Sequence, residues 1–186
     1  RKVANLQEAA GAVYEARVAI VRDYDNQWDA EVDHWHGRIL RPSEDALFTA
    51  LQQSHVMFDY VYLDDFVSVG QLARYSVLFY PHPEILTKQR VKLLEQYTAS
   101  GGKLVVGCRT GQKDLRAFCV AEPHPGLAAY LTGTHVPEYT LAAPDEADVV
   151  INWDGVKLAA PVFRDMLAVC GEDAQVLARY EGGCYA

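Results

Sequence analysis

Short apolar segments alternate with amphipathic ones along the first two thirds of the chain. The apolar segments are rich in Val, Ile, Leu and Tyr, which favour strands, and turn-forming residues follow them. They predict strands over 17–22, 56–62, 76–80 and 103–107.

Two helices are predicted between these strands. The clearer one covers 88–100, where Thr87 suits the N-cap and Gly101 suits a left-handed stop. Another is predicted to begin at Ser43, with apolar side chains at helical spacing after it. Strands separated by helical connections build parallel sheets covered on both faces, so we expect an α/β fold with a flavodoxin-like, doubly wound, mostly parallel sheet.

After about residue 131 the pattern favours strands and hairpins. A fifth strand of the sheet is predicted over 135–140, and 149–151 with 156–158 flank an Asp-Gly pair that suits a tight hairpin. A short helix is predicted over 165–170 and a further strand over 176–180.

Both ends of the chain suggest a piece of a longer polypeptide. Residues 1–15 have apolar side chains at helical spacing, interrupted by Gly11, as expected for the end of a linker helix. Glu181, Gly182 and Gly183 form a turn signal that only a few residues follow. A returning strand is missing after this turn, so we expect a domain truncated at its C-terminal end, and chemistry could reside outside this segment.

Composition narrows the class of protein. Half of the 186 residues are hydrophobic, 23% are charged and the formal net charge is −8, which disfavours nucleic acid and anionic membranes as partners. No apolar run approaches the ~18 residues of a membrane span and no signal peptide is visible, so we expect a cytoplasmic protein. The four cysteines form no C-x-x-C pair, and we predict free thiols and neither metal nor cofactor.

The segment 23–36 is crowded with acids, imidazoles and indoles. It does not fit an EF-hand, because Gln27 and Trp28 stand where an oxygen ligand and glycine are needed. His34 and His36 are two residues apart, which does not suit a zinc pair on a helix. A solvated acidic loop is the simplest interpretation, and a loop that docks a sugar or another domain is the alternative.

The segment 107–114 places Cys108 directly after a predicted strand. A nucleophile elbow would put its reactive residue in the middle of Gly107–Gly111, but Arg109 stands there. A reactive Cys108 would also need a histidine base held by a carboxylate. The sequence lacks the glycine-rich phosphate-binding motifs, and no pair of carboxylates is singled out for glycoside hydrolysis.

These two segments, about 80 residues apart, resemble the middle domain of family 42 glycoside hydrolases, which are bacterial β-galactosidases. The resemblance rests on Asp23-x-Asp25 followed by Trp28, and on Arg109-Thr110-Gly111-x-Lys113-Asp114. It covers residues 16–186, and residues 1–15 resemble the helix that leaves the family's catalytic barrel.

The resemblance implies a fold like that of class I glutamine amidotransferases, without their activity, in a domain that helps to assemble a homotrimer. The whole enzyme would hydrolyse terminal β-D-galactosides with retention, using two glutamates of a barrel absent from this chain. The remaining hypotheses are a stand-alone amidotransferase-like hydrolase that uses Cys108 and a small-molecule-binding module of flavodoxin type.

The residues that carry the resemblance are our candidate binding or interface residues. We expect their charged groups to form a small network at the strand ends, either at a domain or subunit boundary or entirely inside the domain. They are Asp23, Asp25, Trp28, Arg109, Thr110, Gly111, Lys113 and Asp114.

Overall fold

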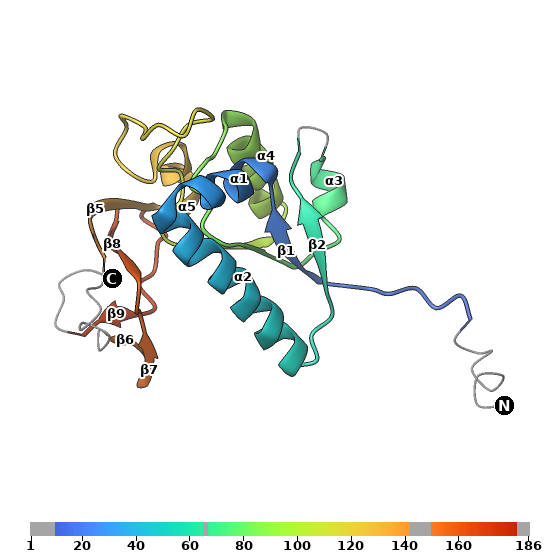
Figure 1. Cartoon of the computed structure of the whole chain (residues 1–186). Coiled ribbons are helices and arrows are strands. Elements are labelled where there is room, and N and C mark those ends of the chain that lie inside the picture. Colours follow the sequence, from blue (N-terminus) through green and yellow to red (C-terminus); the bar gives the residue numbers. More distant parts are fainter. Residues whose placement is uncertain (1–9, 65–66, 142–149, 182–186) are drawn as a thin grey trace.

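The computed structural model describes residues 10–64, 67–141 and 150–181 (Figure 1). Its main sheet has four parallel strands in the order β2-β1-β3-β4. These are β1 (Val18–Arg22), β2 (Phe58–Tyr62), β3 (Val77–Tyr80) and β4 (Lys103–Val106). All four strands predicted from the apolar segments are confirmed, and the fold is mixed α/β.

Four helices accompany the sheet: α1 (Tyr24–Val32), α2 (His34–Gln53), α3 (Val69–Leu72) and α4 (Lys88–Ala99). The helix expected at 88–100 is confirmed, with Thr87 as its N-cap. The helix expected from Ser43 begins nine residues earlier, because the Asp33 carboxylate accepts hydrogen bonds from the backbone of Trp35 and His36. Pro42 therefore lies inside α2 and does not mark its start.

Successive side chains of β1 are buried on opposite faces of the main sheet. Ala19 and Val21 of β1 belong to a buried cluster with Leu94 and Tyr97 of α4. Ile20 points to the opposite face, which α2 covers, and it is fully buried. Figure 1 shows α2 on the near side of the sheet and α4 behind it. The parallel strands thus have helices on both faces.

The last third of the described chain is antiparallel and separate from the main sheet. Strand β5 (Thr134–Leu141) pairs with β8 (Phe163–Val169), and β6 (Val150–Trp153) pairs with β7 (Val156–Ala159) and β9 (Arg179–Tyr180). A 3-10 turn (Gly126–Ala128) and α5 (Ala129–Thr132) precede them.

Of the four predictions for this region, two are wrong, one is confirmed, and the strand predicted over 176–180 is confirmed only at its end, as β9. The segment 135–140 pairs with β8 and is not a fifth strand of the main sheet. The segment 165–170 falls largely within β8 and forms no helix, because its backbone pairs antiparallel with β5. The hairpin at Asp154 and Gly155 is confirmed, with both residues in the left-handed region.

The outer edge of β2 is covered by a side chain. The Tyr14 hydroxyl donates to the Phe58 carbonyl at 3.1 Å and accepts from the Phe58 amide at 2.9 Å. Residues 10–15 form no helix, and the rest of the predicted linker helix lies outside the described residues, as do Gly182, Gly183 and Cys184. Within the described ranges, no helix has the length and apolarity that crossing a bilayer requires.

Candidate functional site

The acidic segment after β1 is the helix α1, not the solvated loop expected from the sequence. Asp23 caps this helix, because its carboxylate accepts a hydrogen bond from the Asn26 amide at 2.8 Å. The same carboxylate accepts one from the Tyr80 hydroxyl and pairs with Arg90 at 3.3 Å. Asp23 is only 1% exposed, so it is a buried structural group.

Asp25 and Asn26 extend this first network. Asp25 pairs with Arg90 at 2.5 Å, so one guanidinium of α4 holds two carboxylates at the start of α1. The Asn26 side chain donates to the Ile85 carbonyl at 3.0 Å and accepts from the Ile85 amide at 2.9 Å. The network therefore anchors α1 to α4 and to the segment that follows β3.

Lys113 lies at the centre of a second network. Its ammonium nitrogen is 2.7 Å from Asp29, 2.5 Å from Asp33 and 2.9 Å from Glu84. Burial acts to lower the pKa of Lys113, but its hydrogen bonds to these carboxylates outweigh burial and raise the pKa above its ordinary value. Lys113 is therefore a permanent internal cation.

Arg109 supplies a second cation to the same network. Its guanidinium is 2.7 Å from Glu84 and 3.4 Å from Asp33, and it lies over the Phe163 ring at 5.3 Å from the centroid. The Arg109 backbone is left-handed, with φ of 61°, and its amide donates to the Asp165 carboxylate at 2.8 Å. This one residue connects the loop after β4 to β8.

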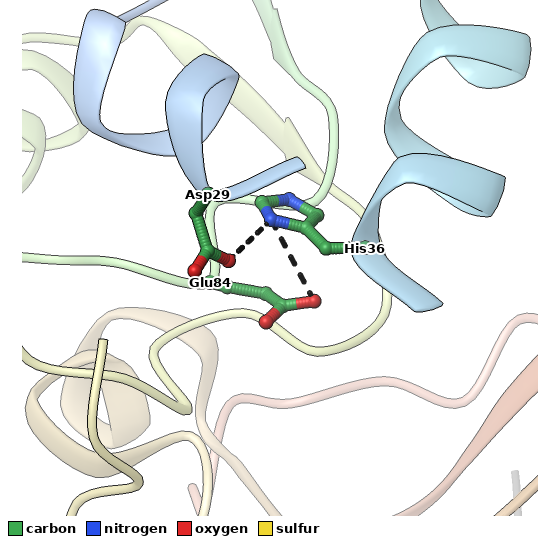
Figure 2. Close-up of side chains that lie close together, drawn as sticks. All are labelled: Asp29, His36 and Glu84. Carbon is green, nitrogen blue, oxygen red and sulfur yellow. Dashed lines mark hydrogen bonds and ion pairs between the residues drawn. The ribbon is translucent and has the colours of Figure 1, made fainter. Parts of the chain in front are cut away.

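His36 is the third cation, on geometric grounds. Its Nδ1 lies 2.7 Å from an Asp29 oxygen and its Nε2 lies 3.0 Å from the His82 carbonyl (Figure 2). Both neighbouring groups can only accept hydrogen bonds, whereas a neutral imidazole has only one N–H to donate. The ring satisfies both contacts only as an imidazolium, and it is 0% exposed.

We call these six residues the ion cluster: Asp29, Asp33, His36, Glu84, Arg109 and Lys113. Three cations face three carboxylates, so the buried charge balances. Burial raises the pKa of Glu84, and His36, Arg109 and Lys113 oppose that rise. For Asp33, burial also acts to raise the pKa, but hydrogen bonds from Lys113 and from backbone amides hold it well below its ordinary value.

Asp29, His36 and Glu84 also place three potential metal-ligand atoms within 4.8 Å of one another. Figure 2 shows the two carboxylates converging on the imidazole. However, the Lys113 ammonium already contacts Asp29 and Glu84, and both His36 nitrogens are engaged. A divalent cation would have to displace the ammonium, so these side chains form an internal ion cluster instead of a metal centre.

Cys108 has a histidine neighbour but not the environment of a nucleophile. Its Sγ is 3.3 Å from His82 Nδ1, and His82 Nε2 is 2.8 Å from the Ser43 hydroxyl. Burial raises the pKa of the Cys108 thiol to about 12 and lowers the pKa of His82 to about 4. Both groups are therefore neutral near pH 7, and Ser43 stands where a carboxylate would stabilise an imidazolium. Nothing in this geometry supports a hydrolase that uses Cys108.

The structure divides the residues that the sequence singled out. Asp23 and Asp25 belong to the Arg90 network, whereas Arg109 and Lys113 belong to the ion cluster. The other four have separate roles. Trp28 is 62% exposed on α1, the Thr110 hydroxyl donates to the Gly107 carbonyl, Gly111 is left-handed, and Asp114 accepts from the amides of a turn at Arg116 and Phe118.

Several members of the two networks were not selected from the sequence: Asp29, Asp33, His36, Glu84 and Arg90. Asp29, Asp33 and His36 lie within the segment 23–36, but the predicted loop gave them no common face. On helices, Asp29 and Asp33 are one turn apart, which is the spacing that could have revealed a shared direction. Glu84 and Arg90 meet these helices only through the tertiary fold.

Comparisons with known proteins agree with the resemblance found in the sequence. The family model described as "Beta-galactosidase trimerisation domain" matches residues 16–186. The chain is 25% identical over 178 residues to a β-galactosidase of Geobacillus kaustophilus, covering 95% of the chain and 25% of that protein. It is 29% identical over 161 residues to a β-galactosidase of Haloferax lucentense, covering 83% and 22%.

Solved structures show the same fold. The β-galactosidase of Bacillus circulans sp. alkalophilus superposes with a TM-score of 0.81 at 20% identity, covering 99% of this chain and 27% of that one. The enzyme of Halorubrum lacusprofundi gives a TM-score of 0.75 at 21% identity, covering 91% and 24%. The chain thus spans about a quarter of the length of the relatives it matches.

Proposed function

Because this chain belongs to the β-galactosidase trimerisation domain family, we propose that it is the non-catalytic assembly domain of a larger β-galactosidase. The family match over residues 16–186 carries this proposal. The partners would be the catalytic barrel of the same polypeptide and two neighbouring subunits in a homotrimer. Residues 1–15 would form the connection to the barrel, and the protein would be cytoplasmic and bacterial.

The chemistry would take place in the barrel. The whole enzyme would hydrolyse terminal β-D-galactosides with retention, using one glutamate as nucleophile and one as acid/base. The ion cluster supports this division, because each of its carboxylates is held by a cation within the domain and none is left to act on a glycoside.

The ion cluster would serve assembly by fixing the carboxyl edge of the sheet. It connects α1, α2, the segment after β3 and the loop after β4 in one buried set of contacts. A surface held in this way keeps its shape before and after a neighbour binds. The strand order β2-β1-β3-β4 also matches the first four positions of a flavodoxin-like sheet, which supports that finer description of the fold.

The test uses the full-length protein that contains this chain. Sedimentation should give the mass of a trimer, and a chromogenic β-galactoside should be hydrolysed. The 186-residue chain by itself should show no hydrolysis. A monomeric full-length enzyme, or hydrolysis by the 186-residue chain, would contradict the proposal.

A further inference from the structure

Helix α1 buries a mainly polar face and exposes an apolar one. Its buried residues are mainly polar, with Asn26 and Asp29 among them, because this face lies over the two charged networks. Its outward face carries Tyr24, Trp28 and Val32, which follow one another at a spacing of four residues and therefore share one side of the helix. They are 57%, 62% and 81% exposed.

Two further aromatic residues flank this face. Tyr62 at the end of β2 stacks on Tyr24 with 5.3 Å between ring centroids, and Tyr24 stacks on Trp28 at 5.7 Å. Trp35 is exposed on the first turn of α2. We call these five residues the α1 stripe: Tyr24, Trp28, Val32, Trp35 and Tyr62.

The α1 stripe has the size and composition of an interface core. Its exposed surface is on the order of 500 Å², more than half of the roughly 800 Å² that each partner buries in a standard interface. Tyrosine and tryptophan dominate the residues that contribute most to binding. Three of its rings already stack, with Tyr24 between Trp28 and Tyr62, so these side chains would lose little freedom on association.

The geometry points to the α1 stripe as a contact surface for a second copy of this protein. Figure 1 shows α1 at the carboxyl end of the sheet, whereas residues 10–17 approach β1 from its amino end. Within the described residues, the chain therefore enters the sheet at the end opposite to the stripe. None of residues 10–64, 67–141 and 150–181 covers the outward face of α1, so this face is accessible to a neighbouring copy.

Charge supports the same occupant. Arg38 lies over the Trp35 ring at 5.1 Å, and within the described ranges no carboxylate forms an ion pair with it. The chain has a net charge of −8, so the surface of another copy offers carboxylates to this guanidinium. In a closed ring of three copies, each contact joins two different patches, one from each copy. The α1 stripe with Arg38 beside it would be one patch, and an acidic surface of the next copy would be the other.

This inference rests on the proposed function, and the experiment separates the two. The full-length protein is compared with its Trp28→Glu and Trp153→Glu variants by sedimentation over a range of concentrations. Trp153 is 49% exposed on the β6–β7 hairpin and provides the matched control. A charged side chain in the centre of an apolar contact should weaken association of Trp28→Glu about tenfold or more, and Trp153→Glu should assemble as the unsubstituted protein does.

The thermal unfolding midpoint of each variant shows whether the variant still folds. Val32→Glu provides a second substitution of the same stripe. Unchanged association of both stripe variants would overturn the inference, as would equal dissociation of the Trp153 control. If the unsubstituted full-length protein is itself monomeric, the proposed function fails first.

Discussion

Two histidines, the buried His36 and the half-buried His82, take different charge states because their hydrogen-bonding partners differ. His36 faces a carboxylate and a carbonyl, which both accept, so its ring carries two protons. His82 donates from Nδ1 to the Cys108 carbonyl at 3.0 Å and can accept from the Ser43 hydroxyl at Nε2, so its ring is satisfied when neutral.

The neutral state of His82 predicts a loss of stability on acidification. Burial lowers the pKa of His82 to about 4, below the ordinary value of 6.5. Between these two pH values, His82 is protonated in the unfolded chain and neutral in the folded one. The stabilising contribution is complete above pH 6.5 and disappears as the pH falls towards 4, at a cost of about 3 kcal/mol.

Urea unfolding from pH 7 to pH 4 measures this effect, with His82→Asn for comparison. Asparagine does not titrate and tolerates the left-handed backbone of this position, where φ is 47°. The variant should lose less stability than the parent chain over this range. Equal slopes for both proteins would rule out His82 as the source.

Lys113 should matter far more than an exposed lysine in an ion pair. Lys113→Met leaves Asp29, Asp33 and Glu84 with one cation fewer in a buried site, and we expect a loss of about 3–5 kcal/mol in the free energy of unfolding. Lys157→Met removes an exposed pair with Glu181 and should cost at most about 1 kcal/mol. Denaturant titration compares them, and similar losses would argue against the ion cluster as a source of stability.

At the scale of elements, the sequence predicted the strands well and the polar helices poorly. Buried parallel strands are continuous apolar runs, which is a local signal. Helix α1 buries Asn26 and Asp29 and exposes Trp28, so its pattern contradicts the usual rule that the apolar face points inward. For the same reason Arg109 and Lys113 could be selected as charged residues at a strand end, but their partners on α1 and α2 could not.

The contact between α1 and α2 depends on one glycine. A Cβ built at Gly37 would lie 2.3 Å from the Ala30 carbonyl oxygen, so Gly37→Ala must push the two helices apart. We expect a loss of about 1–3 kcal/mol in the free energy of unfolding.

Gly70→Ala is the control for this substitution. Its nearest neighbour would be the Ser68 hydroxyl oxygen at 3.9 Å, so alanine should be neutral or slightly stabilising in α3. Thermal unfolding of both variants measures the difference. If Gly37→Ala proved as stable as Gly70→Ala, the helices would not be held at this close approach.

At the scale of the whole molecule, the charged networks lie beneath α1 and most of the α1 stripe lies on the exposed side of the same helix. Polar contacts beneath α1 hold the helix in place, and its apolar side chains remain outside as a consequence. The stabilising interactions inside the domain and the proposed contact with a neighbour therefore depend on the same helix. Damage to the ion cluster would be expected to disturb assembly as well as folding.

The Tyr14 hydroxyl bears on how the edge of the main sheet meets other molecules. An edge strand with unpaired amides and carbonyls can pair with a strand of another molecule and extend the sheet, which leads to aggregation. Here both groups of Phe58 are already engaged by a single hydroxyl. An incoming strand would first have to break that pair of bonds, so a tyrosine placed before β1 protects the start of β2 from unwanted polymerisation.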